Sequence, residues 1–117
     1  MSYEMFFWRQ TKECRHRPTT IVKRLCEGGK LEGLVEIPIA KFTKRLSEAF
    51  PGFDGQIYQT KSKSWYFTTD WIPPFGLQVV MDRPVTNETM KMANTLIEVA
   101  GEFKCALFDP QTNQRYE

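Results

Sequence analysis

The most regular hydrophobic pattern in the chain lies near its C-terminal end. Apolar residues recur there at intervals of three and four, and they are Met92, Ala93, Leu96, Ile97, Val99, Ala100 and Phe103. This is the spacing of a helix that buries one broad face. Pro84 disfavours helix just before the stretch, Thr86 or Asn87 can cap its first amides, and Gly101 is the predicted terminator. The pattern therefore predicts one long helix on which the other elements pack.

Alternation with a period of two predicts the strands. They fall at residues 3–8, 56–60, 64–71, 76–82 and 105–108. The first strand is apolar on both faces, so either both faces are covered or one is reserved for a partner. Turns are predicted at residues 61–63 and at Pro73-Pro74, and Pro110 stops the last strand because it lacks an amide donor.

Two shorter helices are predicted between the first and second strands. One runs from Pro18 to Cys26 and ends at Gly28-Gly29, and the other begins at Pro38 and ends at Pro51-Gly52. The element order is then βααβββαβ. Short turns between strands favour antiparallel pairing. We expect one α+β domain over residues 1–117, with about five strands in a mixed or antiparallel sheet and three helices covering at least one face.

Composition agrees with a single globular domain, since 41% of the 117 residues are hydrophobic and 26% are charged. The net charge of +2 is unevenly distributed: residues 1–64 hold twelve Lys/Arg and seven Asp/Glu, and residues 65–117 hold four and seven. No apolar run is long enough for a membrane helix, and the first residues lack the charged region of a signal peptide. Together with an odd number of cysteines, three, this predicts a reduced, cytoplasmic protein.

Residues suited to catalysis or metal binding are sparse. The soft metal ligands are Cys14, His16, Cys26 and Cys105. Their spacing matches no common zinc pattern, and Cys14 beside His16 lacks a third group to orient the pair. The aspartates fall at predicted turns and strand ends, where they commonly bond backbone amides. We therefore expect no catalytic residue, no metal, no cofactor and no enzymatic activity.

A basic run lies beside Trp8 and comprises Arg9, Lys12, Arg15, Arg17, Lys23 and Arg24. Positive grooves with exposed aromatic rings are typical of proteins that bind single-stranded nucleic acid. No recognised RNA-binding motif accompanies the run. A small single-stranded nucleic-acid-binding module is therefore the alternative function, and a small hydrolase ranks third.

The segment 65–75 is the most unusual in composition, because aromatic residues crowd it. Alternation puts Trp65 and Trp71 on one face and Tyr66 with Asp70 on the other. Exposed aromatic rings beside a charge are typical of protein interfaces, and a well-packed strand pair explains the same pattern without a partner. The predicted partner contacts are Tyr66, Asp70, Trp71 and Phe75.

Both ends of the chain resemble those of a small bacterial family. The start MSYEMFFW, residues 1–8, is similar to its MSYD…FW start, and residues 105–111 with 114–116, CALFDPQ and QRY, resemble its C-x-L-Y-D-P-Q…Q-R-F end. Residues 37–39 and 49–52, IPI and AFPG, resemble its middle helix and the following FPG. Phe108 and Tyr116 exchange the two aromatics of the end motif, and the similarity is weakest over residues 56–82.

Members of this family resemble immunity proteins of polymorphic toxin systems, including contact-dependent growth inhibition. The resemblance implies that the chain binds the toxic C-terminal domain of a cognate effector, often a nuclease, and neutralises it in the producer's cytoplasm. Acidic groups near Asp70 suit a basic toxin cleft, whereas the basic run suits an acidic toxin surface, so occlusion of the active site and binding outside it both stay open. No membrane partner and no direct nucleic-acid partner are expected.

Overall fold

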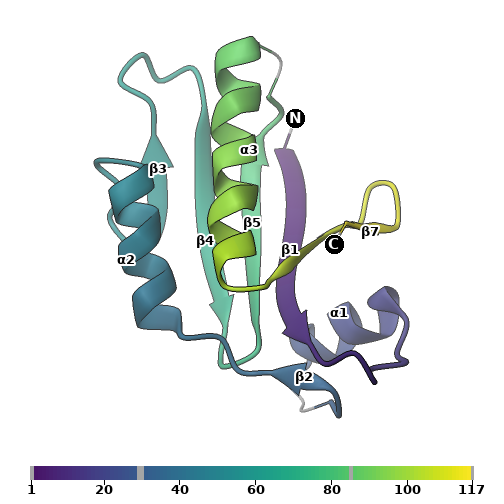
Figure 1. The fold of residues 1–117 in the computed structure, drawn as a ribbon. Coiled ribbons are helices and arrows are strands. Elements are labelled where there is room, and N and C mark those ends of the chain that lie inside the picture. The colour runs from purple at the N-terminus through teal and green to yellow at the C-terminus, as the bar shows by residue number, and fades with distance from the viewer. Residues whose placement is uncertain (1, 29–30, 85, 117) are drawn as a thin grey trace.

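The computed structural model describes residues 2–28, 31–84 and 86–116. They fold into an α+β domain with three helices and an antiparallel sheet of seven strands (Figure 1). In chain order the elements are β1 (Ser2–Gln10), α1 (Pro18–Cys26), β2 (Leu34–Val35), α2 (Ile39–Ala49), β3 (Ile57–Gln59), β4 (Tyr66–Ile72), β5 (Gly76–Asp82), α3 (Asn87–Glu102), β6 (Ala106–Asp109) and β7 (Gln114–Tyr116). Across the sheet the strands run β3-β4-β5-β1-β6-β7, and β2 also pairs with β1.

The predicted α+β class and its three helices are confirmed, but the count of about five strands and the order βααβββαβ are wrong. Strand β2 lies in a stretch that shows no alternation, and it pairs only with Arg9 and Gln10. Strand β7 follows the turn after Pro110, which ends β6 without ending the sheet. Strands of two and three residues are too short to produce a period-two pattern, so the sequence alone does not reveal them.

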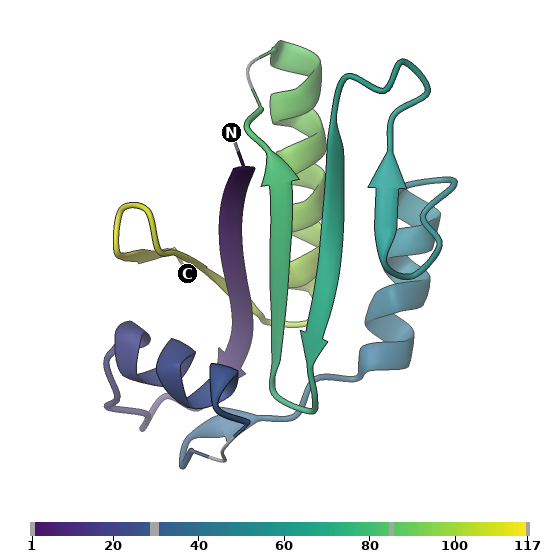
Figure 2. The same ribbon diagram turned by 180° about the vertical axis from the view of Figure 1, so that it is seen from behind.

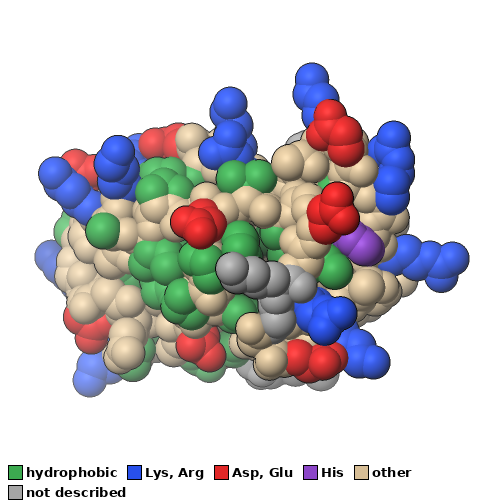
Figure 3. Space-filling view, turned by 90° about the horizontal axis from the view of Figure 1, so that it is seen from below, with side chains coloured by type: hydrophobic (Ala, Val, Ile, Leu, Met, Phe, Trp, Pro, Cys, Tyr) green, Lys and Arg blue, Asp and Glu red, His purple; other side chains and the backbone are tan. Residues whose placement is uncertain are grey.

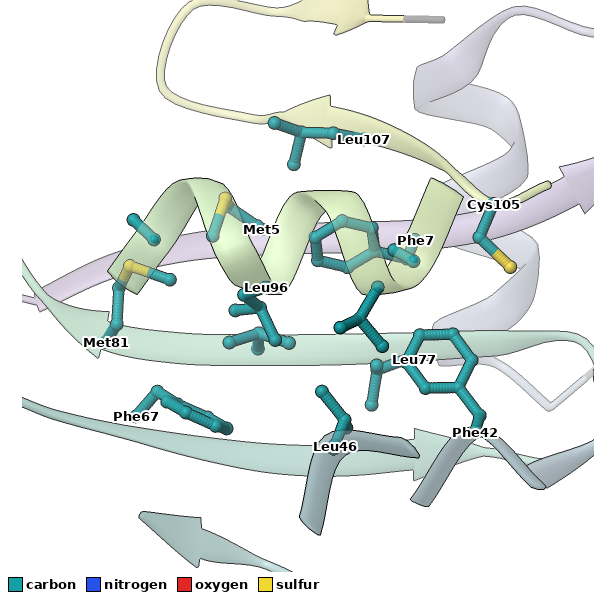
Figure 4. Close-up of a cluster of buried hydrophobic side chains, with 14 of the residues drawn as sticks. Met5, Phe7, Phe42, Leu46, Phe67, Leu77, Met81, Leu96, Cys105 and Leu107 are labelled. Atoms are coloured by element: carbon teal, nitrogen blue, oxygen red, sulfur yellow. The ribbon is translucent and has the colours of Figure 1, made fainter. Parts of the chain in front are cut away.

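One face of the sheet carries the main hydrophobic core, beneath α2 and α3 (Figures 1 and 4). Strand β1 contributes Met5 and Phe7 to it, and β4 and β5 contribute the residues that alternate in the same sense. The largest fully buried members of this core are Trp65, Phe7, Phe42, Phe67, Leu46, Leu77, Met81 and Leu96. Burial of this many large apolar side chains is the main stabilising contribution of the fold.

The opposite face of the sheet is covered only at one end, by α1 (Figure 2). There Phe6 and Trp8 of β1 pack with Ile21 and Leu25 of α1. Gly76 permits this close approach, because a Cβ atom at that position would lie 3.0 Å from Cδ1 of Leu25. The rest of this face, over β3, β4, β5 and the start of β1, carries no helix.

Helix α3 begins and ends with regular capping motifs. The hydroxyl of Thr86 accepts a hydrogen bond from the Thr89 amide at 3.1 Å, and the Thr89 hydroxyl accepts one from the Thr86 amide at 3.0 Å. The helix continues through Gly101, so the prediction that this glycine terminates it is wrong. Instead Lys104 adopts the left-handed conformation, with φ of 58°, and the Cys105 amide bonds back to the Ala100 carbonyl at 3.0 Å.

The other predicted helix ends agree better with the structure. Gly28 after α1 and Gly52 after α2 have φ of 75° and 100°, a conformation that glycine adopts without steric cost. Gly29, also predicted as a terminator, lies outside the described residues. Pro38 occupies the N-cap position of α2, one residue before the first helical residue, Ile39. No helix in the described ranges is both long enough and apolar enough to cross a membrane.

The two end motifs that carry the family resemblance meet in space. The Tyr3 hydroxyl donates a hydrogen bond to the Asp109 carboxylate, which is buried. The side-chain amide of Gln111 accepts from the Glu4 backbone amide at 3.1 Å and donates to the Glu4 carbonyl at 2.9 Å. Gln111 thus pairs with β1 as a strand residue would, just beyond the point where β6 ends.

The later residues of the two end motifs also contact each other, through aromatic rings and a guanidinium group. The rings of Trp8 and Phe108 lie 5.8 Å apart, and the guanidinium carbon of Arg115 lies 5.2 Å from the centre of the Trp8 ring. Both ends of the chain therefore contribute to one structural joint between β1, β6 and β7. The start and end motifs are therefore two parts of one packed unit.

Candidate functional site

The part of the sheet that α1 leaves uncovered is the candidate functional site, and we call it the open face. Its side chains come from alternate positions of β1, β3, β4 and β5. Its members are Glu4, Ile57, Gln59, Tyr66, Thr68, Asp70, Gln78, Val80 and Asp82. One row crosses four strands through Ile57, Thr68, Val80 and Glu4.

Exposure along β4 follows the strand period and separates the two faces. Asp70 is exposed and Tyr66 and Thr68 are half-buried, whereas Phe67 and Thr69 between them are buried. At the edge of the sheet Ile57 is 49% exposed, which makes it one of the most exposed large apolar residues of the described chain. The open face therefore presents apolar and aromatic surface to solvent beside its polar groups.

The charge of the open face has one sign. It carries the carboxylates of Glu4, Asp70 and Asp82, and none of its nine side chains is a Lys or Arg. Exposed basic residues include Lys12, Arg15, Arg17, Lys23 and Arg24 on α1 and in the loop before it, and Lys61 and Lys63 in the loop between β3 and β4. Figure 3 looks at the end of the molecule that carries α1, where Lys and Arg side chains project beside the histidine.

The edge strand of the open face is held by a turn at Asp54. Its carboxylate accepts hydrogen bonds from the backbone amides of Ile57 at 2.7 Å and Gln56 at 2.8 Å. These bonds favour the charged form and hold the pKa of Asp54 below its usual value. At the other end of the face, the Trp65 indole donates to the backbone carbonyl of Asp82 at 2.9 Å. The first anchor holds the edge strand β3, and the second joins the start of β4 to the end of β5.

The structure brings together two of the four predicted contacts. Tyr66 and Asp70 share the open face, as the alternation of β4 predicts. Trp71 points to the opposite face, where its ring meets the Phe42 ring edge-on with centroids 5.2 Å apart. Phe75, in the turn between β4 and β5, packs against the smaller hydrophobic cluster under α1. Trp71 and Phe75 are both partly buried, so their rings support the fold.

Sequence reasoning missed the other acidic members of the face, Glu4 and Asp82. Asp82 occupies a polar position of an alternating strand, so the period-two signal marks it as solvent-facing, but the first strand is apolar on both faces and gives no such signal for Glu4. Their place beside Asp70 depends on β1 pairing with β5, which no local pattern reveals. Glu4 lies opposite Val80, far along the chain, because β1 occupies the middle of the sheet.

The candidate metal ligands are dispersed. Cys105 is buried, and burial raises the pKa of its thiol to about 11. Cys26, the last residue of α1, is exposed, and the buried residues of that helix are Ile21 and Leu25. Within the described ranges, His, Cys, Asp and Glu side chains form no group of three or more that could hold a metal ion.

Comparisons with models of protein families and with curated proteins find no match to this chain. The resemblance to the immunity family therefore rests on the sequence motifs alone. The two end motifs form a structural joint, and Glu4 is the one member of the open face that they include, so they carry information mainly about the fold.

Proposed function

We propose that this protein acts by covering the surface of another protein, and that it is an immunity protein for the toxic C-terminal domain of a cognate effector. The observation that carries the proposal is the open face, a sheet surface with three carboxylates, no basic side chain and no helix over it. A surface of one charge sign suits a partner of the opposite sign. The substrate cleft of a nuclease is such a partner, because it is built to hold phosphates.

The residues of the open face have two different roles in this proposal. Glu4, Asp70 and Asp82 attract a basic partner and orient it during encounter. Tyr66 and Ile57 supply apolar area that becomes buried in the complex, which is where most binding energy arises. Of the four contacts that the sequence predicts, Tyr66 and Asp70 are retained. Trp71 and Phe75 are assigned to positioning the strands.

The alternative function, a single-stranded nucleic-acid-binding module, needs an aromatic platform beside the basic run. Trp8 was the candidate platform, but its side chain is fully buried under α1 and Arg115. Bases cannot stack on a ring without exposed surface. The basic residues of α1 remain exposed, but the aromatic stacking surface on which the prediction of single-stranded nucleic-acid binding depends is not. Binding to another protein is therefore the better-supported proposal.

The test is co-expression with the C-terminal domain of the effector encoded immediately upstream. We expect the two chains to purify together and the pair to restore growth that the toxic domain alone arrests. Asp70→Lys reverses one charge of the open face and should weaken co-purification and growth rescue. The matched control is Glu98→Lys, which makes the same change at an exposed position of α3 on the other side of the sheet.

One result would contradict the proposed function, and another would contradict only the proposed contact face. One is a wild-type chain that neither binds the toxic domain nor restores growth. The other is an Asp70→Lys variant that folds, as judged by circular dichroism, and still protects as well as the Glu98→Lys control. The second result would leave immunity standing and would place the contact elsewhere on the molecule.

A further inference from the structure

A cavity of about 540 Å³ lies beside β6, at the end of the molecule away from the open face. Its walls come from the end of β1, the loop that follows, the turn after α3, and β7. The chain brings these segments together only through the joint between its two end motifs. The cavity shares no lining residue with the open face, so its role is independent of the proposed immunity function.

The lining of this cavity is cationic. Lys12, Lys104 and Arg115 all line it, and none of its described lining residues carries a carboxylate. Arg9 adds a fourth positive charge nearby, because it precedes the lining residue Gln10 on β1. Like charges gathered in one concavity repel one another, and a bound anion would remove that repulsion.

Two of the cations belong to backbone that is held in place. The guanidinium of Arg115 lies over the Trp8 ring, 5.2 Å from its centre, on a strand that pairs with β6. Lys104 is held by the turn that ends α3, in a left-handed conformation with φ of 58°. That position usually carries glycine, and the turn places the backbone of Lys104 at the cavity wall.

Polar groups complete the lining. The Gln10 side-chain oxygen accepts a hydrogen bond from the Trp8 indole at 2.8 Å, which leaves its amide nitrogen as the donor end. The Thr11 hydroxyl lies next to it along the chain. A guanidinium, two ammonium groups and neutral donors are the groups that proteins use for phosphate oxygens.

We propose that this cavity binds a small phosphorylated compound, with Arg115, Lys104 and Lys12 contacting its phosphate oxygens. The volume falls within the range of roughly 300–1,000 Å³ usual for small-molecule sites. Arg115 supplies directional, paired donors, and the two lysines supply mobile charges that adapt to one or two phosphates. The ligand is held by its phosphate, so inorganic pyrophosphate and a nucleoside diphosphate share the same contacts.

The test is isothermal titration of the full chain with pyrophosphate and with ADP at constant ionic strength. We expect saturable binding of at least one of them with one-to-one stoichiometry. Lys104→Asn removes a charge and keeps a residue that tolerates the left-handed conformation, and it should weaken binding about tenfold, equivalent to about 1.4 kcal/mol. The matched control is Lys63→Asn, because Lys63 also has φ of 58° and lies in the loop between β3 and β4.

Lys12→Gln, in an exposed loop, provides a second variant whose folding is not at risk, and it should weaken the same titration. The proposal is overturned if neither probe binds at millimolar concentration, or if Lys63→Asn weakens binding as much as Lys104→Asn. It is also overturned if a single-stranded oligonucleotide binds while pyrophosphate and ADP do not. That outcome would make the basic surface a nucleic-acid contact and not a small-ligand site.

Discussion

Tyr3 and Asp109 lie 106 positions apart in the sequence, and a hydrogen bond between their side chains joins the start of the chain to its end. Burial and this bond together raise the pKa of Tyr3 to about 12. Burial alone would raise the pKa of Asp109, but hydrogen bonds from Tyr3, Gln111 and Thr112 outweigh it and hold that pKa below its usual value. The pair therefore stabilises the fold in its neutral-tyrosine, charged-aspartate form.

The first prediction concerns how stability depends on pH. A raised tyrosine pKa contributes stability that is complete below its ordinary value of 10.0 and is lost as pH rises toward about 12. A lowered aspartate pKa contributes stability above its ordinary value of 3.8 that is lost as pH falls through the folded value. Tyr3→Phe should remove the tyrosine's share of the alkaline loss and reduce the acid loss. Near neutral pH it should cost about 1–3 kcal/mol.

Urea denaturation from acid to alkaline pH measures both effects. Tyr116→Phe is the matched control, because its hydroxyl donates to Gln114 at the exposed surface, the side chain is 48% exposed, and its charge affects the pKa of Tyr3 less than burial and Asp109 do. We expect that variant to follow the wild-type pH profile within about 0.5 kcal/mol. Equal profiles for Tyr3→Phe and Tyr116→Phe would show that the terminal joint adds no stability.

At the scale of single elements, the strand period decides which aromatic residues support the fold and which face a partner. Tyr66 and Trp71 belong to the same strand, but an odd number of positions separates them, so they project from opposite faces of the sheet. Trp71 packs on Phe42 of α2, whereas Tyr66 lies on the open face. The sequence pattern contains this distinction, although the sequence alone predicts Tyr66, Asp70, Trp71 and Phe75 all as partner contacts.

The second prediction follows from that separation. Trp71→Ala removes a large ring from the contact between β4 and α2 and should cost about 3 kcal/mol of unfolding free energy, because a cavity replaces it. Tyr66→Ala should cost less than about 1 kcal/mol and instead weaken binding of the toxic domain. Chemical denaturation of both variants, beside their co-purification with that domain, separates the two effects. A stable Trp71→Ala variant that fails to bind would restore Trp71 to the interface.

Longer elements are predictable from sequence because their signals are local. Helix α3 shows its apolar stripe and the Thr86 cap, and β4 and β5 show a clear period of two. Strands β2 and β7 are set by pairing with distant segments, and their few residues give no period. The end of α3 also escaped prediction, because Lys104 occupies a position where glycine is the expected signal and Gly101 lies within the helix.

At the scale of the whole molecule, β1 determines the arrangement of the functional surfaces. It lies between β5 and β6, and it therefore adds Glu4 to an acidic face formed mainly by β4 and β5. The C-terminal end of β1 leads into the basic loop before α1, and Gln10 at that end lines the cationic cavity. The separation of charge in the fold therefore does not follow the two halves of the chain, because the acidic face includes Glu4 and the cavity includes Lys104 and Arg115. The sequence alone suggests Asp70 and Tyr66 as contacts, but the other members of their face can be identified only when the strand order is known.

The third prediction tests whether this charge separation drives recognition. If the open face attracts a basic cleft from a distance, neutralising Glu4 or Asp82 with Gln or Asn should slow association with the toxic domain and leave dissociation nearly unchanged. Raising salt from about 0.01 M to 0.15 M shortens the screening length from about 30 Å to about 8 Å, so the wild-type association rate should fall steeply.

Stopped-flow association at several salt concentrations measures this effect, and Glu98→Gln on α3 is the matched control for lost charge. Long-range attraction depends on where a charge lies as well as on net charge. The variants of the open face should therefore lose part of the salt dependence, while the control keeps the wild-type slope. Equal salt dependence for the open-face variants and the control would mean that association depends on net charge and not on where the carboxylates lie. The acidic face would then be solvated surface, and the partner would bind through its apolar groups alone.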